Sequence, residues 1–170
     1  MGAIVGKKYI FDIETTGLDF PENRIISIAV KDIDNGSAEV FINIDEEVIL
    51  NQFWQKIADA EEVIGFNVLE FDLPALIQRS VVKRVKIKKP KKVIDLRKEV
   101  AGFWYSYNKM TKGTLRLWSE LLGTSAKTLD GGQMIQAWLK EDFETVKIHN
   151  LEDVELTFLL YKRMKECEVI

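Results

Sequence analysis

Two carboxylates, Asp12 and Glu14, stand two residues apart in the otherwise apolar segment YIFDIE. In a β-strand both side chains point to the same face, because alternate residues share a face. Two neighbouring carboxylates on a buried face repel each other and lose hydration, and a bound cation offsets both costs. The pair therefore indicates a metal site, although a DxE pair is more often two solvated charges at the end of a strand.

The turn after this pair, Thr15-Thr16-Gly17, adds hydroxyl and backbone N–H groups beside the carboxylates. Successive N–H groups in a turn form concave sites for anions. A phosphate or a terminal ribose could therefore lie next to the predicted metal site.

A third carboxylate, Asp72, follows the segment Gly65-Phe66-Asn67 and begins the run Asp72-Leu73-Pro74. A helix is expected to start there, since proline is tolerated in the first turn. Asp is also a preferred N-cap residue, so Asp72 could be a helix cap, a metal ligand or both.

A fourth carboxylate, Asp153, lies four residues after His149, the only histidine of the chain. On a helix these two side chains share one face. A lone histidine is more often structural than functional. Next to a metal ligand, its unperturbed pKa of about 6.5 would suit a general base.

The three segments FDIETTG, GFNVLEFDLPAL and HNLEDVELT resemble, in this order, the three exonuclease motifs of the DEDD superfamily. The sequence GFN…FDLP looks most like that of the proofreading domains of family-B DNA polymerases and their stand-alone relatives. The resemblance extends from Tyr9 to about Tyr161. It implies an α/β, ribonuclease H-like fold and a 3′→5′ exonuclease that releases nucleoside monophosphates from single-stranded DNA by a two-metal-ion mechanism, with Mg²⁺ or Mn²⁺.

The resemblance also implies roles for individual residues. The family's metal ligands fall on Asp12, Glu14, Asp72 and Asp153, and its general base falls on His149. Its contacts to the terminal nucleotides fall on Thr15, Thr16, Leu18, Asn67 and Phe71. The spacing H-x3-D is that of the family's tyrosine subgroup with His in place of Tyr, whereas the histidine subgroup has H-x4-D.

Two other functions remain open on the sequence. One is an RNA-trimming 3′→5′ exoribonuclease, since recognition of the 2′-hydroxyl depends on details of the pocket. The other is a non-catalytic nucleic-acid-binding module, against which the presence of all four carboxylates argues. A homo-oligomer, or a polymerase or repair partner bound in trans, would fit so small an enzyme.

The pattern of apolar residues and turn signals predicts a mixed five-stranded sheet flanked by helices. Strands are expected over residues 7–13, 24–33, 38–44, 62–66 and 93–96. Helices are expected from about residues 46 and 72, and over 114–122, 132–139 and 145–165. The dipeptide Asn35-Gly36 predicts a two-residue hairpin turn between the second and third strands.

Composition is that of one globular domain over residues 1–170, with 46% hydrophobic and 30% charged residues. The single cysteine cannot form an internal disulfide, and the N-terminus does not resemble a signal peptide, so a cytoplasmic location is expected. No apolar run reaches the roughly 20 residues that a membrane span needs, so no membrane partner is expected.

The net charge of −3 does not indicate a nucleic-acid partner, but seven Lys or Arg lie between Lys83 and Lys92. This basic segment, and in particular Lys88, Lys89, Lys91 and Lys92, could attract a phosphate backbone. A solvated charged loop is the equally weighted alternative. The aromatic run 103–107 could stack on unpaired bases, although most aromatic residues belong to a core.

Overall fold

The computed structural model of the chain describes residues 6–100, 114–124 and 131–170. The aromatic run at residues 103–107 lies outside these ranges. No helix within them is both long and apolar enough to span a lipid bilayer.

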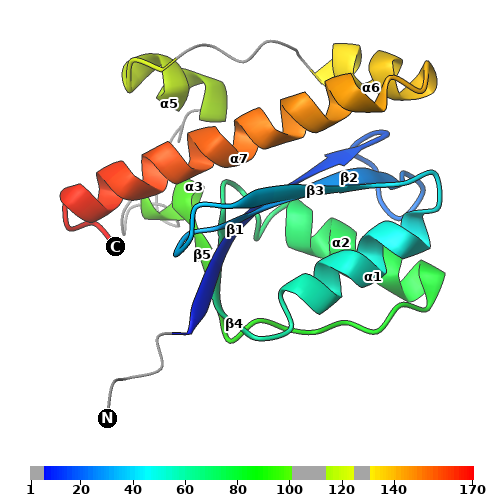
Figure 1. Ribbon diagram of the computed structural model, residues 1–170, viewed down its shortest axis with the longest axis horizontal. Coiled ribbons are helices and arrows are strands. Elements are labelled where there is room, and N and C mark those ends of the chain that lie inside the picture. The colour runs from blue at the N-terminus through cyan, green and yellow to red at the C-terminus, as the bar shows by residue number, and fades with distance from the viewer. Residues whose placement is uncertain (1–5, 101–113, 125–130) are drawn as a thin grey trace.

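Five strands of the described residues form one mixed sheet in the order β3-β2-β1-β4-β5 (Figure 1). Neighbours β1–β2 and β2–β3 are antiparallel, whereas β1–β4 and β4–β5 are parallel. The strands are β1 (Lys7–Thr15), β2 (Ile25–Asp32), β3 (Ala38–Ile42), β4 (Ala60–Gly65) and β5 (Lys92–Asp95). The predicted mixed five-stranded sheet is confirmed, and every predicted strand is present with ends shifted by no more than two residues.

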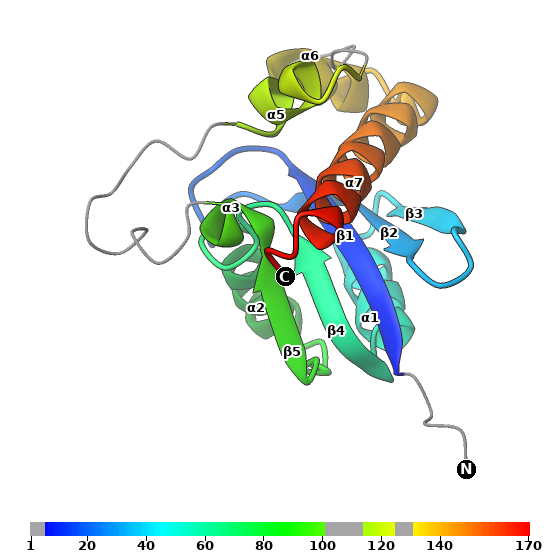
Figure 2. The ribbon, with the colours of Figure 1, turned by 90° about the vertical axis from the view of Figure 1, so that its left-hand side faces the viewer.

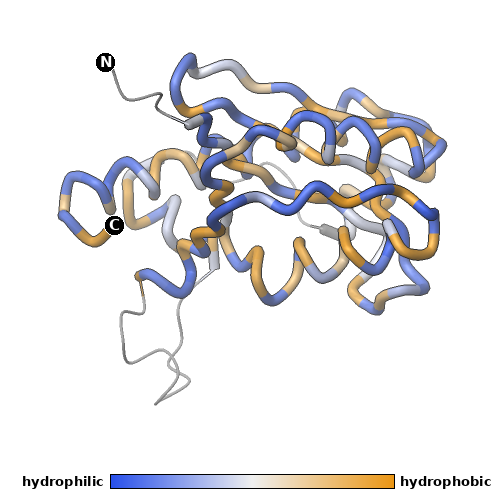
Figure 3. The backbone as a smooth tube through the Cα atoms, turned by 90° about the horizontal axis from the view of Figure 1, so that it is seen from below, coloured by the Kyte–Doolittle hydropathy of each residue, from blue (hydrophilic) through white to orange (hydrophobic). Residues whose placement is uncertain are grey.

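Helices cover both faces of this sheet. The helices are α1 (Glu46–Lys56), α2 (Asp72–Lys83), α3 (Leu96–Glu99), α5 (Leu115–Leu121), α6 (Gly131–Leu139) and α7 (Phe143–Glu166). Helices α1 and α2 lie on one face, and the long α7 crosses the other with α5 and α6 outside it (Figures 1 and 2). Hydrophilic and hydrophobic residues follow each other in short stretches along the helices, as expected where one helix face is buried (Figure 3).

The two faces of β1 enter two different hydrophobic cores. Phe11 and Ile13 pack with α1 and α2, and Ile10 packs with α7. Because side chains alternate along a strand, residues 12 and 14 share the face of Ile10. The central strand therefore directs Asp12 and Glu14 towards α7.

The hairpin between β2 and β3 differs from the predicted two-residue turn. The strands end at Asp32 and resume at Ala38, so five residues connect them. The carboxylate of Asp32 accepts hydrogen bonds from the backbone N–H groups of Asp34 and Asn35, and Gly36 adopts a positive φ of 75°. The Asp32 side chain organises a longer turn in which only the glycine needs the left-handed conformation.

Candidate functional site

The first carboxylate, Asp12, is tied to α7 by Asn150. The side-chain amide of Asn150 donates to Asp12 Oδ2 at 2.9 Å, and Asn150 Oδ1 accepts from Ser27 Oγ at 2.9 Å. Asn150 is fully buried. One amide thus connects α7 to β1 and β2 and fixes one oxygen of Asp12.

Glu14 meets the same helix at His149 and Asp153. The Nε2 atom of His149 lies 3.4 Å from Glu14 Oε1. One donor atom from each of Glu14, His149 and Asp153 lies within 4.8 Å of the other two. His149 is 3% exposed and Asp153 is 5% exposed. The predicted i, i+4 pair on α7 therefore faces the predicted DxE pair on β1.

Asp72 reaches the site from the opposite face of the sheet. Its Oδ1 accepts a hydrogen bond at 3.2 Å from the backbone N–H of Ile13, which lies beyond Ile10, the last residue of β1 in register with β4. The turn before Asp72 approaches β1 closely, because a Cβ at Gly65 would meet Phe11 O at 3.0 Å and Val68 Cγ1 at 2.1 Å. The glycine is thus needed to bring Asp72 to β1.

The alternative role of Asp72 as a helix N-cap is wrong. The N-cap of α2 is Phe71, which makes no side-chain cap, and Asp72 is the first helical residue. The carboxylate accepts a hydrogen bond from the backbone N–H of Ile13 on β1. Its place in the first turn still suits the positive end of the helix dipole.

Burial raises the pKa of Asp72 to about 7, and the negative charges of Asp95 and Asp153 act in the same direction. Hydrogen bonds from backbone N–H groups, including that of Ile13, oppose the rise. Asp72 is therefore a carboxyl group crowded by other carboxylates, and a cation beside it would favour its ionised form.

Asp95, at the end of β5, is a structural anchor for the turn before Asp72. Its carboxylate accepts hydrogen bonds from the backbone N–H groups of Asn67, Leu69 and Arg97, at 2.9, 3.1 and 3.0 Å. It is 2% exposed. The bonds from Asn67 and Leu69 hold the turn in place. By accepting the bond from Arg97, Asp95 also caps the N-terminus of α3.

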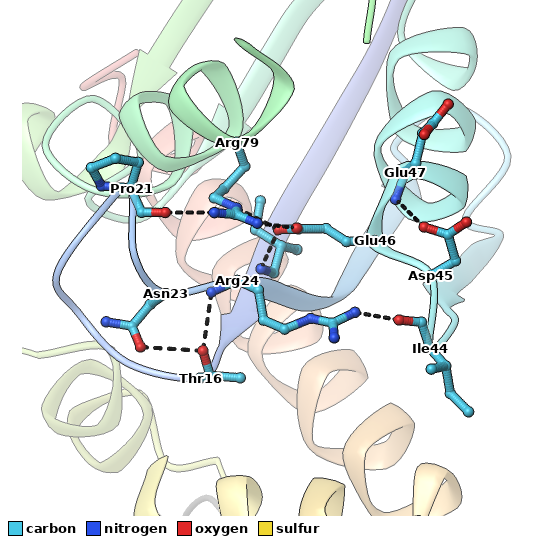
Figure 4. A network of polar contacts seen from close by, with 10 residues as sticks. Thr16, Pro21, Asn23, Arg24, Ile44, Asp45, Glu46, Glu47 and Arg79 are labelled. Atoms are coloured by element: carbon cyan, nitrogen blue, oxygen red, sulfur yellow. Dashed lines mark hydrogen bonds and ion pairs between the residues drawn. The ribbon is translucent and has the colours of Figure 1, made fainter. Parts of the chain in front are cut away.

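The loop after Glu14 uses its own threonine hydroxyls. Thr15 Oγ1 donates to Gly17 O at 2.8 Å. Thr16 Oγ1 donates to Asn23 Oδ1 and accepts from the N–H of Arg24 (Figure 4). A phosphate that bound to these hydroxyls, as predicted, would have to compete with the hydrogen bonds that they make inside the loop. Leu18, at the loop's tip, is 78% exposed.

A buried ion pair between Glu46 and Arg79 fastens this loop to α1 and α2 (Figure 4). Glu46 accepts from Arg79 and from the N–H of Ile25, while Arg79 also donates to the carbonyl of Pro21. The side chain of Glu46 is completely buried. The loop is therefore held at both its middle and its end.

The two other residues with an implied nucleotide contact, Asn67 and Phe71, flank the turn before Asp72. Asn67 has a positive φ of 70°, and its side-chain oxygen accepts from Arg97 at 2.7 Å. Phe71 is half-buried and contacts Phe20 edge to face, with ring centroids 5.8 Å apart. Both lie in the segment that carries Asp72, so the structure brings them to the same region as the carboxylates.

The basic segment lies at the other end of the parallel strands. Lys92 pairs in register with Glu62 near the start of β4, whereas Asp95 pairs with Gly65 at its end. Along α2, Asp72 and Lys83 are about 16.5 Å apart, at about 1.5 Å per residue. Lys91 and Lys92 form ion pairs with Glu61 and Glu62. The structure does not bring the predicted lysine patch to the carboxylates.

The donor set fits hard or borderline divalent cations. Carboxylate oxygens suit Mg²⁺ and Mn²⁺, and the imidazole nitrogen adds a donor that transition metals accept. The crowding of buried Asp72 by Asp95 and Asp153 is the arrangement that a divalent ion stabilises. Asp12, Glu14, Asp72 and Asp153 would hold such ions.

Sequence reasoning missed the residues that position these ligands. Asn150 stands beside His149 in the third motif, and its neighbours were the only signal of its role. Asp95 lies at the end of a predicted strand, but no local pattern indicated that its carboxylate would bind the backbone N–H of Asn67. The pair Glu46–Arg79 gave no local signal, because its partners are 33 residues apart.

Known proteins support the same fold and superfamily. The model for the RNase_H superfamily matches residues 9–165. An uncharacterized protein of Methanocaldococcus jannaschii is 34% identical, over 96% of this chain and 98% of the relative. The family B DNA polymerase of the hyperthermophilic archaeon Pyrobaculum calidifontis has a similar structure, with a TM-score of 0.76 and 19% identity. The match covers 94% of this chain but 24% of the polymerase chain, and it confirms the ribonuclease H-like fold.

Proposed function

Because the chain belongs to the RNase_H superfamily, we propose that it is a metal-dependent 3′→5′ exonuclease that releases nucleoside monophosphates from single-stranded DNA. The superfamily supports nuclease chemistry in general. The polarity and the substrate are inferred from the three motifs. The proposal implies two divalent ions, Mg²⁺ or Mn²⁺, and a nucleic-acid substrate.

The observation that carries the proposal is the meeting of Glu14, His149 and Asp153, whose donor atoms lie within 4.8 Å of one another. Asp12 shares the face of Glu14, and Asp72 lies against the backbone between them at Ile13. Residues from β1, α2 and α7 thus converge at the end of β1. A merely structural cluster of this kind would carry the cost of several buried like charges.

Bound divalent ions would supply Lewis acidity and an activated water for phosphodiester hydrolysis. The protein's own residues then bind and orient. Asn150 holds Asp12, Asp95 holds the turn before Asp72, and the Glu46–Arg79 pair holds the loop that carries exposed Leu18. Rigid placement of this kind is how a site keeps its ligands in productive geometry.

The test uses the full-length protein with single-stranded DNA, duplex DNA and RNA, each labelled in turn at the 3′ and 5′ ends. Mg²⁺, Mn²⁺ and EDTA are compared, and Asp12→Ala and Asp153→Ala are the variants. We expect metal-dependent release of labelled mononucleotides from 3′-labelled DNA, a descending ladder from 5′-labelled DNA, and no product with either variant. Circular dichroism of each variant confirms that it folds.

Each alternative predicts a different pattern. Preferential degradation of RNA would replace the DNA assignment by an exoribonuclease. Binding without hydrolysis under every metal condition would indicate the non-catalytic module. Hydrolysis that survives both substitutions would overturn the role of the carboxylates.

A further inference from the structure

We propose that His149 is itself a metal ligand, through Nε2, to the ion that Glu14 and Asp153 bind, rather than a general base. The inference deepens the proposed function and rests on it, because the ion is one that the nuclease site would hold. Its consequence is a site that selects Mn²⁺ and similar transition metals over Mg²⁺.

The spacing of His149 and Asp153 supports this assignment. They are four residues apart within α7, so their side chains lie one turn apart on a single helix face. The same i, i+4 spacing allows the helical H-E-x-x-H motif to give two ligands to a single zinc ion. The sequence H-x3-D in this chain provides an imidazole and a carboxylate in that arrangement.

The distances also suit ligands of one ion. Two donors that each lie about 2.1 Å from a metal, at angles between about 90° and 109°, are about 3.0–3.4 Å apart. His149 Nε2 and Glu14 Oε1 are 3.4 Å apart. One donor atom of each of the three residues lies within 4.8 Å of the other two, so small side-chain shifts would bring all three to one ion. The three donors come from only two elements, β1 and α7.

A ligand role and a general-base role exclude each other at Nε2. The lone pair that binds a metal cannot also take a proton from an attacking water. The Nε2 atom is the one that faces Glu14, and the ring is 3% exposed. The Nε2 atom is therefore directed at a carboxylate oxygen that could share a metal ion with it, rather than at open solvent.

A mixed nitrogen and oxygen donor set has a predictable metal preference. Mg²⁺ strongly prefers oxygen donors and keeps much of its water, whereas imidazole suits transition metals. Mn²⁺ accepts both carboxylate and imidazole. Loss of the imidazole should therefore weaken Mn²⁺ binding at this position and leave Mg²⁺ binding nearly unchanged.

The first test exploits the fact that the chain has one histidine. In ¹⁵N-labelled protein the imidazole gives one pair of ring-nitrogen signals, and titration with a spin-active cadmium isotope reports coordination through the bond. We expect a one-bond coupling between cadmium and Nε2. A bound cadmium ion without this coupling, or no cadmium binding at all, would overturn the assignment.

The second test is calorimetric titration of Mn²⁺ and Mg²⁺ into the wild-type protein, His149→Gln and Glu14→Gln. We expect His149→Gln to lower Mn²⁺ affinity about tenfold or more and Mg²⁺ affinity less than about twofold. Glu14→Gln removes a carboxylate that suits either metal, so it should lower the affinity for both Mn²⁺ and Mg²⁺. Equal Mn²⁺ affinity in the wild type and His149→Gln would contradict the ligand role.

Neither test measures hydrolysis, so failure of the metal-ligand assignment can be distinguished from failure of the proposed function. Cadmium coupling in a protein that releases no labelled nucleotides would retain the ligand assignment and reject the nuclease. An active nuclease with no coupling and unchanged Mn²⁺ affinity would return His149 to the role of general base.

Discussion

The side-chain amide of Asn150 donates a 2.9 Å hydrogen bond to Oδ2 of Asp12, across 138 residues of sequence. The same amide contacts the backbone carbonyl of Asp12 at 3.3 Å, and its oxygen accepts from Ser27. Asn150 thus holds one carboxylate oxygen of Asp12 in place from α7. It is a positioning residue for the DxE pair.

Replacement of Asn150 by Ala should lower metal-dependent hydrolysis about 10–100-fold, the usual effect of losing an outer-shell partner of a ligand. The free energy of unfolding should also fall by about 1–3 kcal/mol, because buried Ser27 loses its acceptor. Initial rates at several metal concentrations and urea denaturation measure the two effects separately.

Ser27→Ala is the matched control. It removes the hydrogen bond to Asn150 Oδ1 but retains the bond from the amide to Asp12. Stability should fall modestly while hydrolysis stays within a few-fold of the wild type. If Ser27→Ala and Asn150→Ala reduced the rate equally, the bond to Asp12 would not be the one that matters.

The raised pKa of Asp72 predicts that the metal-free protein loses stability as the pH rises. The pKa is about 7 in the folded state against a reference of 3.8. The folded state therefore binds this proton more tightly, and the benefit is complete below about pH 4 and lost as the pH passes 7. The loss amounts to about 4 kcal/mol for a shift of this size. Urea denaturation in EDTA between pH 4 and pH 8 measures it.

Asp72→Asn isolates this effect, since its side chain stays neutral throughout. As the pH rises to about 8, the unfolding free energy of the wild type should fall relative to that of the variant. Added Mn²⁺ should reverse the trend in the wild type only. A difference that stays constant over this pH range would refute the raised pKa.

The strands and most helices could be predicted because each is encoded by local apolar periodicity and turn residues. The four candidate ligands could be identified because each lies in a motif. What fixes them was not predictable, since Asn150 reaches Asp12 and Asp95 reaches Asn67 only after distant segments pack. The predicted two-residue hairpin turn was wrong for a related reason. The Asp32 side chain accepts hydrogen bonds from backbone N–H groups and lengthens the turn.

The basic segment should affect long substrates only. Lys88 and Lys89 are exposed at the end of the sheet away from the carboxylates. Lys88→Gln/Lys89→Gln should weaken the binding of a long single strand at low salt and reduce the slope of log affinity against log salt by up to about 1.4, at about 0.7 for each phosphate contact. Binding of a dinucleotide should be unchanged. Fluorescence anisotropy across a salt series measures both.

Lys91→Gln/Lys92→Gln serves as the control for that double variant. It removes the same charge from the same segment, but these lysines already pair with Glu61 and Glu62. The salt slope should change less than in Lys88→Gln/Lys89→Gln. An unchanged slope in all variants would assign the basic segment to a solvated loop.

The buried pair Glu46–Arg79 predicts a large cost for removing one partner and a smaller cost for removing both charges. Arg79→Met leaves the fully buried Glu46 with the N–H of Ile25 but without its counter-ion, which should lower the unfolding free energy by about 3–5 kcal/mol. Adding Glu46→Gln removes the uncompensated charge while keeping an oxygen for Ile25, so the double variant should regain more than half of the loss. Urea denaturation at low ionic strength gives both values. A double variant no more stable than Arg79→Met would show that packing, rather than the unpaired charge, accounts for the cost.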